Sequence, residues 1–570
     1  MKRFNLSNIR RQAHEPSGKA LLLLVWLIVA LMMPNVVLAF TERHTPWSAA
    51  AGVILPLGLY LLTLLFTRRI SLVALALLPI LALCAVQIVL LYLYGNSTIA
   101  VDMFTNIMTT NTTESSELLG GLMPIILLVG LLYAPLLYMI VRQTGSRCYT
   151  LTEKARRGAL FTGGLLTIVG VQLLLPARMV AGESVVREEI FPANAIHNLD
   201  IALRNKQMVR DYRHTSATFD HEAERTAEIL QREIYILVIG ESSRAANWSL
   251  YGYPRTTNPR LSQRKDICLF RNVTTQRNTT HKSVPMMLTS VGADEYEALF
   301  QRKGIADIFK SVGFRTCFIS TQSPQGAMVD NLAAECDEVI YIGAPSHDEQ
   351  LLQMVERIVE SDSEEDLLFV LHCYGSHFRY NRRYPRDVAH FTPDDAMAVN
   401  ATNIEALRNS YDNSIIYTDR LLDSIIGYLA DLGDCTAMLY CSDHGEDLFD
   451  DERGMFLHAS PKVTYYQLHV PCLAWFSEEY CTLYPDKVTM ARRHRWSPAT
   501  TAAIFHTLTE IASIRSRYID PRQSLVSAGF DEAAPRLYLN DHNEALPLDQ
   551  RIGITDLDQR EFLLHGIIID

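Results

Sequence analysis

A carboxylate and an imidazole stand side by side in Ser442-Asp443-His444-Gly445-Glu446, directly after the apolar run Thr436–Cys441. The apolar run predicts a buried strand, and the glycine predicts a loop behind it. Carboxylate oxygen and neutral imidazole nitrogen are ligands for divalent metals, zinc in particular. An isolated Asp-His pair is also typical of a helix cap beside an ordinary loop histidine, so further strand ends must support a metal site.

A second apolar run, Ile234–Gly240, ends in the same way, with Glu241 as the next residue. Ligands of α/β sheets usually bind at the carboxyl ends of the strands. We therefore predict that Glu241, Asp443 and His444 supply three metal ligands at that edge. A hydroxyl in a fourth position would have a lowered pKa and would become a nucleophile.

Several hydroxyls could fill that fourth position, because the loop Thr274–Pro285 is rich in them. Residue types alone leave open Thr274, Thr275, Thr279, Thr280 and Ser283. His377 and His458, in two further loops, could bind phosphate or protonate a leaving alkoxide. His281 and His372 are interpreted as structural or supporting residues.

The elements that must position these residues begin at Glu233, where apolar strands alternate with helix-like segments. Strands are expected at Ile234–Gly240, Thr316–Thr321, Leu367–Cys373, Thr436–Cys441 and His469–Phe476. Helices are expected at Ile305–Ser311, Glu349–Ser361, Ile404–Leu432 and Pro498–Ile511. Continuous apolar strands separated by helices predict a mostly parallel sheet covered by helices on both faces.

Five long apolar stretches precede this region, near residues 20–40, 47–66, 71–94, 118–141 and 159–176. Each approaches the roughly 20 residues that a helix needs to cross a bilayer, and none contains an internal Lys, Arg, Asp or Glu. The first stretch is too long for a simple signal peptide and lacks its cleavage site. We predict a transmembrane domain of five helices over residues 1–176.

Basic residues set the expected orientation. They gather before the first span, between the second and third, and between the fourth and fifth, whereas the other two loops contain only Arg43. The amino terminus is therefore expected in the cytoplasm and the chain after residue 176 outside it. Residues 177–232 are interpreted as a linker, either solvated or with a helix along the membrane surface, and residues 233–570 as the catalytic domain.

The composition indicates which partners and which cysteine chemistry to expect. A net charge of −11 argues against nucleic acid. Eight of the ten cysteines fall in the exported part, where an even number permits disulfides without fixing their pairing. No CxxC pair is present, so a cysteine zinc site is not expected.

Taken together, the motifs resemble the membrane-bound phosphoethanolamine transferases that modify lipopolysaccharide, a branch of the alkaline phosphatase and sulfatase superfamily. The matching segments are Ile239–Arg244, Ser249–Arg255, Thr257–Pro259, Ser283–Pro285, Gly375–His377, Arg383–Pro385, Ser410–Asn413, Ser442–Glu446 and Leu457–His458. The resemblance covers nearly the whole chain. It implies a five-helix transmembrane domain followed by an α/β domain like those of alkaline phosphatases and sulfatases.

The resemblance also implies roles for single residues. Glu241 and the pair Asp443-His444 match the zinc ligands of the family. Thr280 matches the threonine that binds the zinc, attacks phosphorus and carries the phosphoethanolamine. His377 and His458 match histidines that contact the transferred group or a second zinc. One tightly bound Zn²⁺ is expected, and a second is left open.

Three residues of the membrane half recur every four positions. Asn106, Thr110 and Glu114 would share one face of a helix in the exported loop between the third and fourth spans. The resemblance implies that this triple contacts the phosphoethanolamine head, where a carboxylate can pair with the ammonium. The alternative is a solvated polar turn, with residues 111–113 as helix breakers.

Two departures from the family put the acceptor in doubt. Gln276 and Met286 stand where lipid A-modifying members often carry a disulfide bracketing the nucleophile loop. The chain also lacks a lysine between residues 311 and 461, where many members place one that holds the substrate phosphate. The guanidinium groups that could replace it belong to Arg379, Arg382 and Arg383.

The resemblance implies an enzyme of the bacterial inner membrane with its catalytic domain in the periplasm. It would take phosphoethanolamine from phosphatidylethanolamine and pass it, through a phosphothreonine, to lipopolysaccharide at lipid A or the core. The added ammonium would weaken attraction for cationic peptides such as polymyxin. Membrane lipid is expected as a partner, nucleic acid is not, and the chain is expected to be a monomer.

The residues also allow two alternative functions. The first is a phosphoglycerol transferase or lipoteichoic acid synthase, and the second is an inactive membrane sensor or scaffold with the same fold. A sulfatase is disfavoured because no Cys-x-Pro-x-Arg or Ser-x-Pro-x-Arg stands at the nucleophile loop.

Overall fold

The computed structural model describes residues 18–41, 45–94, 98–109, 112–143, 149–181, 185–227, 231–324, 326–343, 346–361, 364–395 and 403–569. The chain divides into two compact units. One comprises residues 1–100 and 122–200, and the other comprises residues 101–121 and 201–570. The expected domain limits at residues 176 and 232 remain predictions.

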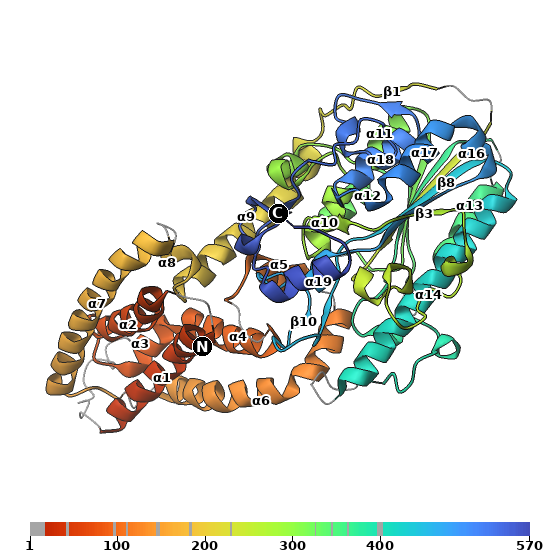
Figure 1. Ribbon diagram of the computed structural model, residues 1–570. Helices are drawn as coiled ribbons and strands as arrows, with labels where there is room; N and C mark the ends of the chain where they lie inside the picture. The colour runs from red at the N-terminus through yellow and green to blue at the C-terminus, as the bar shows by residue number, and fades with distance from the viewer. Residues whose placement is uncertain are drawn as a thin grey trace, which may run out of the picture. The chain divides into compact units, whose positions relative to one another are not determined.

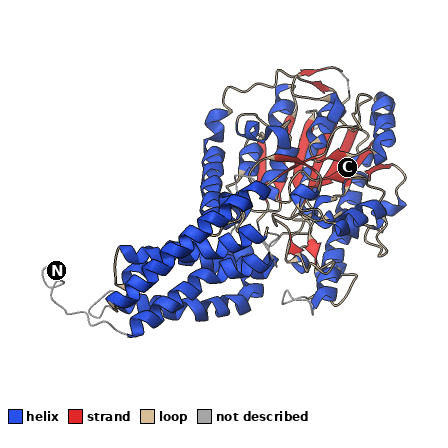
Figure 2. Cartoon of the chain, turned by 60° about the vertical axis from the view of Figure 1, so that its left-hand side comes forward, coloured by secondary structure: helices blue, strands red, loops and turns tan. Residues whose placement is uncertain are grey.

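The first unit is built from apolar helices (Figure 2). They are α1 (Gly18–Thr41), α2 (Pro46–Leu62), α3 (Ile70–Ala76), α4 (Leu78–Tyr94), the larger part of α6 (Thr112–Gln143), α7 (Glu153–Ala181) and α8 (Val185–Glu188). Four helices in the described ranges are long and apolar enough to span a membrane. The count reaches five if α3 and α4 form one span. The expected number of five spans is therefore matched only on that condition.

The break between α3 and α4 bends the chain by 63°. Pro79 stands in the first turn of α4. Proline has no backbone N–H to donate, and its ring restricts the preceding residue, so it is tolerated at a helix start but not in the interior. The stretch near 71–94, expected as one helix, is therefore two.

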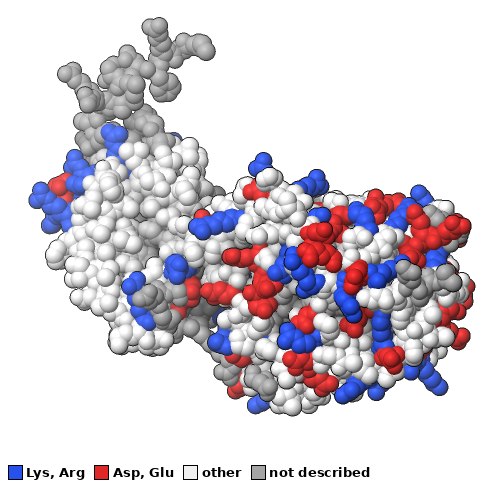
Figure 3. Space-filling model, turned by 90° about the horizontal axis from the view of Figure 1, so that it is seen from above, with Lys and Arg blue, Asp and Glu red and all other residues white. Residues whose placement is uncertain are grey.

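The surface of the first unit suits a hydrocarbon environment. Phe66 is 89% exposed, Phe161 76% and Leu131 73%. The face of this unit that Figure 3 presents carries few charged side chains over its helices. Apolar area of this extent on a folded surface marks contact with lipid or with another apolar surface.

The second unit is built around a seven-stranded sheet in the order β3-β11-β8-β2-β7-β5-β6. Its strands are β2 (Glu233–Gly240), β3 (Ile267–Phe270), β5 (Arg315–Ser320), β6 (Glu338–Tyr341), β7 (Leu367–His372), β8 (Cys435–Ser442) and β11 (Cys472–Phe476). β2, β5, β6, β7 and β8 are paired in parallel, but β11 runs antiparallel to both of its neighbours. The sheet is therefore mixed. Five neighbouring strands are parallel, as the sequence predicted, and the antiparallel direction of β11 was not predicted.

Helices cover both faces of this sheet (Figures 1 and 2). Because side chains alternate along a strand, Leu237 and Ile239 enter one core and Ile236 and Val238 the other. The first core is closed by α10 (Thr280–Met287), α11 (Ile305–Ser311), α12 (Met328–Ala333) and α18 (Ala503–Ile511). The second is closed by α13 (Glu349–Ser361) and α14 (Ile404–Asp431).

Two further helices belong to the second unit wholly or in part. α5 (Val101–Thr109) lies between two apolar helices in the sequence, yet it packs with the sheet domain. α9 (Ala193–Thr215) joins it from residue 201 onward, and Val209 O of α9 accepts a hydrogen bond of 2.7 Å from Asn331 Nδ2.

Strand register brings the candidate ligands to one edge. Gly240, the last residue of β2, pairs with Ser442, the last residue of β8. Ile239 pairs with His372 at the end of β7. The residues after these strands therefore begin at the same level, and the loops that follow meet above the centre of the sheet.

Candidate metal centre and nucleophile

The structure brings Glu241, Asp443 and His444 together, as the sequence predicted. One ligand atom from each of the three lies within 4.8 Å of the others, and all three side chains are buried. His444 Nε2 lies 3.5 Å from Glu241 Oε1 and 3.3 Å from Asp443 Oδ2. Three metal-ligating groups from two neighbouring strand ends thus face one point.

The two oxygens of Asp443 have different environments. Oδ1 accepts hydrogen bonds from the backbone N–H of Ser242 at 3.1 Å and of His444 at 2.8 Å. Oδ2 is buried without a hydrogen-bond partner among the described residues. Burial and the charge of Glu241 raise the pKa of Asp443 well above its usual range. An orphaned carboxylate oxygen of this kind requires a cation or a proton.

The imidazole of His444 completes the acceptor set. Its Nδ1 lies 3.0 Å from Gly445 O, which can only accept, so this nitrogen carries the proton. In the neutral ring Nε2 then presents its lone pair towards Glu241 and Asp443. Acceptors that face each other around one point fit a divalent metal, and one imidazole with two carboxylates suits zinc.

Thr280, the first residue of α10, points its hydroxyl at the same place. Oγ1 lies 3.0 Å from Glu241 Oε2 and 3.2 Å from His444 Nε2. The other hydroxyls of the loop have different partners. Thr275 and Ser283 each donate to Asp443 O at 2.6 Å, Thr279 contacts Asp102, and Thr274 contacts Ala499 O. The geometry therefore favours Thr280 among the five candidates that the sequence left open.

His458 and His377 lie beside this cluster. The ring centroid of His458 is 4.2 Å from that of His444 and 6.4 Å from that of His377. His458 Nδ1 is 3.0 Å from Glu446 Oε1, and Tyr380 donates its hydroxyl to Glu446 Oε2 at 2.6 Å. Burial raises the pKa of Glu446 to about 7 and lowers that of His458 well below its ordinary value. Glu446 thus orients His458.

Several supporting residues carried no signal in the sequence. Gln322 donates to Glu241 Oε2 at 3.2 Å and lies 3.3 Å from His372 Nε2, so the predicted supporting role of His372 is to hold this amide. Asp348 accepts the backbone N–H groups of Tyr374 and Gly375, each at 2.9 Å, and so fixes the loop that leads to His377. Both residues stand in loops without a recognisable pattern.

The predicted headgroup triple is only partly visible. Asn106 lies on α5 and is partly buried. Thr110 lies outside the described residues, and Glu114 belongs to α6 with its side chain undescribed. Among the guanidinium candidates, Arg383 stacks 3.8 Å from the ring centroid of Tyr374 and donates from Nε to His377 O at 3.1 Å.

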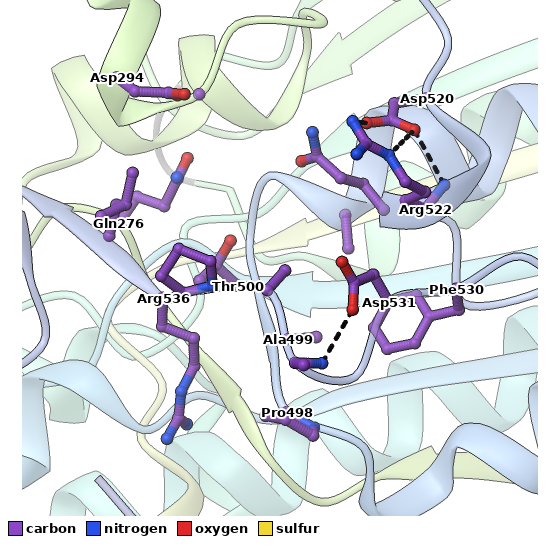
Figure 4. A pocket seen from close by; sticks show the side chains of 17 residues that line it. Gln276, Asp294, Pro498, Ala499, Thr500, Asp520, Arg522, Phe530, Asp531 and Arg536 are labelled. Carbon is purple, nitrogen blue, oxygen red and sulfur yellow. Dashed lines mark hydrogen bonds and ion pairs between the residues drawn. The ribbon is translucent and has the colours of Figure 1, made fainter. Parts of the chain in front are cut away.

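A separate cavity of about 350 Å³ lies on another side of the nucleophile loop. Figure 4 shows its lining, which includes Gln276, Asp294, Thr500, Phe530 and Arg536. None of the metal-ligating residues lines it. Gln276 stands at the position where the resemblance implies a cysteine in relatives, and it borders this cavity.

All nine cysteines that the structure describes are free.

Comparison with known proteins finds relatives of this chain. Residues 233–514 match the Sulfatase family. Phosphoethanolamine transferase EptA of Escherichia coli K12 is 32% identical over 307 residues, which are 50% of this chain and 54% of that protein. The chain thus spans about half the length of that curated relative.

Two longer matches include the apolar helices. The Kdo(2)-lipid A phosphoethanolamine 7''-transferase of E. coli K12 is 25% identical over 488 residues, 78% of this chain and 83% of that protein. The integral membrane lipooligosaccharide phosphoethanolamine transferase A of Neisseria meningitidis aligns with a TM-score of 0.70 at 22% identity, covering 90% and 99%. At that identity the likeness shows the fold, that of apolar helices followed by an alkaline-phosphatase-like domain.

Proposed function

We propose, from the premise that residues 233–514 are a sulfatase-family domain, that this chain transfers phosphoethanolamine from phosphatidylethanolamine to lipopolysaccharide. Relatives named for phosphoethanolamine transfer align with half of the chain at 32% identity and with 78% of it at 25%. The observation that carries the proposal is the placement of the Thr280 hydroxyl, 3.0 Å from Glu241 and 3.2 Å from His444. A sulfatase would need cysteine or serine in its own motif there.

The donor set supports zinc. Glu241, Asp443 and His444 would hold the ion, because their buried acceptor atoms converge and Asp443 Oδ2 has no other partner among the described residues. A bound zinc ion would act as a Lewis acid toward the hydroxyl and the transferred phosphoryl group. One tightly bound zinc ion is proposed, and a second zinc ion stays a prediction.

The chain's own residues then define two displacements. In the first, Thr280 Oγ1 forms a bond to phosphorus, the bond from phosphorus to the diacylglycerol oxygen breaks, and the hydroxyl proton ends on diacylglycerol. In the second, an acceptor oxygen bonds to phosphorus, the bond to Thr280 breaks, and the acceptor's proton returns to the threonine. His458 and His377 are placed to hold the phosphoryl oxygens or to pass these protons.

The proposed cellular location of the protein rests on the apolar helices of the first unit. Its apolar helices would lie in the inner membrane, with the sulfatase-like domain in the periplasm, where donor lipid and nascent lipopolysaccharide are both available. Asn106, Thr110 and Glu114 are proposed to contact the donor's head. The product would carry an added ammonium, so cationic peptides such as polymyxin would bind the cell surface less strongly.

Two substitutions test the proposal with the full-length chain and fluorescent phosphatidylethanolamine. Thr280→Ala is expected to abolish release of labelled diacylglycerol while zinc content stays near wild type. Glu241→Ala is expected to lose both activity and zinc, because it removes a ligand. The matched control is Thr482→Ala, since Thr482 is exposed on a different helix. Wild-type turnover by Thr280→Ala would remove this threonine from the mechanism.

The covalent step and the acceptor have direct readouts. Mass spectrometry of the peptide containing Thr280, after quenching with donor but without acceptor, should show a phosphoethanolamine adduct. Lipid A and core from cells with and without this chain should differ by phosphoethanolamine. A glycerol phosphate adduct formed with phosphatidylglycerol as donor, and no adduct formed with phosphatidylethanolamine, would instead indicate a phosphoglycerol transferase.

A further inference from the structure

Asp102, on α5, is a fully buried carboxylate that contacts the nucleophile loop from outside the metal centre. Its side chain is 0% exposed. Oδ2 accepts from Arg277 Nε at 2.8 Å and is also contacted by Arg277 Nη2. Oδ1 lies 2.9 Å from Lys282 Nζ and 3.2 Å from His281 Nε2. One carboxylate thus contacts three basic side chains of the short segment Arg277–Lys282.

These partners stand on both sides of Thr280 in the sequence. Arg277 precedes it by three residues and Lys282 follows it by two, and both are 1% exposed. Thr279, directly before the nucleophile, has its hydroxyl 3.3 Å from Asp102 Oδ2. The segment that carries Thr280 is therefore held from both ends by the same buried group.

Other contacts make this arrangement stiff. Arg277 Nη1 donates to Leu539 O at 2.9 Å, and Nη2 lies 3.2 Å from Asp541 Oδ1. Lys282 Nζ donates to Asn543 Oδ1 at 2.9 Å. Each cation thus connects α5 to residues 539–543 through contacts on both sides.

The position of Asp102 is itself fixed. Asp541 accepts the backbone N–H of Val101 through Oδ2 at 2.6 Å and that of Asp102 through Oδ1 at 3.4 Å. A carboxylate at a helix amino terminus stabilises the helix through its orphan N–H groups. Burial alone would raise the pKa of Asp102, but Arg277 and Lys282 outweigh burial and hold it well below its usual range. Asp102 is therefore a charged anchor on a capped helix.

We propose that Asp102 is a positioning residue for the nucleophile, which fixes the Arg277–Lys282 segment so that the Thr280 hydroxyl points at Glu241 and His444. This inference rests on the proposed function of Thr280. Asp102 does not touch the metal-ligating atoms, so it acts through the backbone of the loop. Displacing a reacting group by about 1 Å can cost on the order of 100-fold in rate.

The first experiment is Asp102→Asn in the full-length, zinc-loaded protein. This change keeps the shape but removes the charge that pairs with Arg277 and Lys282. We expect kcat to fall by about 10- to 100-fold while KM for phosphatidylethanolamine changes less than about threefold. Zinc content should stay at the wild-type level, because the ligands are unchanged. Asp211→Asn, an exposed substitution on α9, is the matched control and should retain wild-type kcat.

A second measurement does not depend on activity. Amide hydrogen exchange across residues 276–284 should become faster in Asp102→Asn than in wild type, while exchange in β2 and β8 stays unchanged. Wild-type kcat in Asp102→Asn, or unchanged exchange in this segment, would overturn the inference. If wild type itself transferred no phosphoethanolamine, the proposed function would fail and the exchange result would still decide the positioning.

A charge-retaining variant covers the case in which Asp102→Asn does not fold. Asp102→Glu keeps the ion pairs but moves the carboxylate by one methylene in a packed site. Its kcat is expected between those of Asp102→Asn and wild type. A fall in kcat in Asp102→Glu with unchanged exchange across residues 276–284 would contradict a positioning role.

Discussion

The two carboxylate oxygens of Asp443 have different environments. Its Oδ1 is satisfied by two backbone N–H groups, which fix the carboxylate plane. Its Oδ2 is buried without a hydrogen-bond partner among the described residues, and we propose that it binds the metal. Two neighbouring buried carboxylates, Glu241 and Asp443, repel one another when no cation lies between them. Without a cation, Asp443 therefore favours the protonated form, in agreement with its raised pKa.

Asp443→Asn is predicted to abolish the stabilisation that zinc gives. With chelator present, the variant should unfold at the same temperature as metal-free wild type or a few degrees above it, because the neutral amide need not take up a proton to avoid repulsion from Glu241. Added zinc should stabilise wild type, by about 4 kcal/mol at 1,000 times Kd, but not the variant. Thermal unfolding with chelator and with zinc measures both.

The zinc-dependent shift in unfolding temperature shows whether Asp443 is a metal ligand or only accepts backbone hydrogen bonds. If Asp443 served only to hold Ser242 and His444, the asparagine oxygen would still accept those N–H groups and zinc would stabilise both proteins equally. Equal zinc shifts would therefore exclude Asp443 as a ligand.

The sequence was informative about residues whose partners lie at adjacent strand ends. Glu241 and Asp443 each follow an apolar run, and parallel strands align their carboxyl ends, so their meeting was predictable. Asp102 was not, because it stands about 175 residues from Arg277 in a segment expected to be a loop between spans. A single aspartate there has no periodicity to distinguish it.

At the scale of elements, the loop after β7 must pass very close to the loop after β2. Gly375 has φ +53°, and a Cβ there would lie 2.7 Å from Glu241 O and 2.8 Å from Glu241 N. Ser376 N donates to Glu241 O at 2.9 Å. The backbone that carries one metal ligand is thus packed against the backbone that leads to His377.

Gly375→Ala is predicted to lower zinc affinity and transfer together, because the added methyl must push the Glu241 backbone away. Gly252→Ala is the matched control. Gly252 has φ +101° with no heavy atom within 4 Å of a Cβ, so it carries the backbone strain of about 1–2 kcal/mol without the collision. Zinc titration and diacylglycerol release on both variants provide the measurement.

Comparing Gly375→Ala with Gly252→Ala separates the steric collision with Glu241 from the backbone strain that both substitutions cause. Equal losses of zinc affinity in the two variants would show that left-handed strain alone accounts for the effect. An unaffected Gly375→Ala would mean that the two loops can separate without moving Glu241.

Element types were predicted better than their directions and continuity. The expected helices Ile305–Ser311 and Glu349–Ser361 are confirmed to the residue, since both have marked apolar periodicity. β3 and β6, four residues each, were missed because such short runs resemble loops. The direction of β11 was not predictable, because apolar content does not distinguish parallel from antiparallel strands.

At the scale of the whole molecule, the sheet domain is discontinuous in sequence. Residues 101–121 belong to it, although residues 122–200 of the first unit follow before the chain returns at residue 201. Val101, Met103 and Phe104 of α5 are buried. The sheet domain is therefore incomplete without a segment that a cut at the predicted linker would remove.

An excised protein of residues 201–570 is predicted to be less stable than the same domain supplied with α5. It would leave Arg277 and Lys282 without Asp102, and removing one partner of a buried ion pair costs about 3–5 kcal/mol. A peptide of residues 98–109 added in trans should raise the unfolding temperature and slow exchange in residues 276–284. The same peptide with Asp102→Asn should have little effect, because it restores the apolar contacts without the charge. If both peptides stabilised equally, apolar packing rather than the buried carboxylate would connect α5 to this domain, and if neither did, α5 would not be part of its fold.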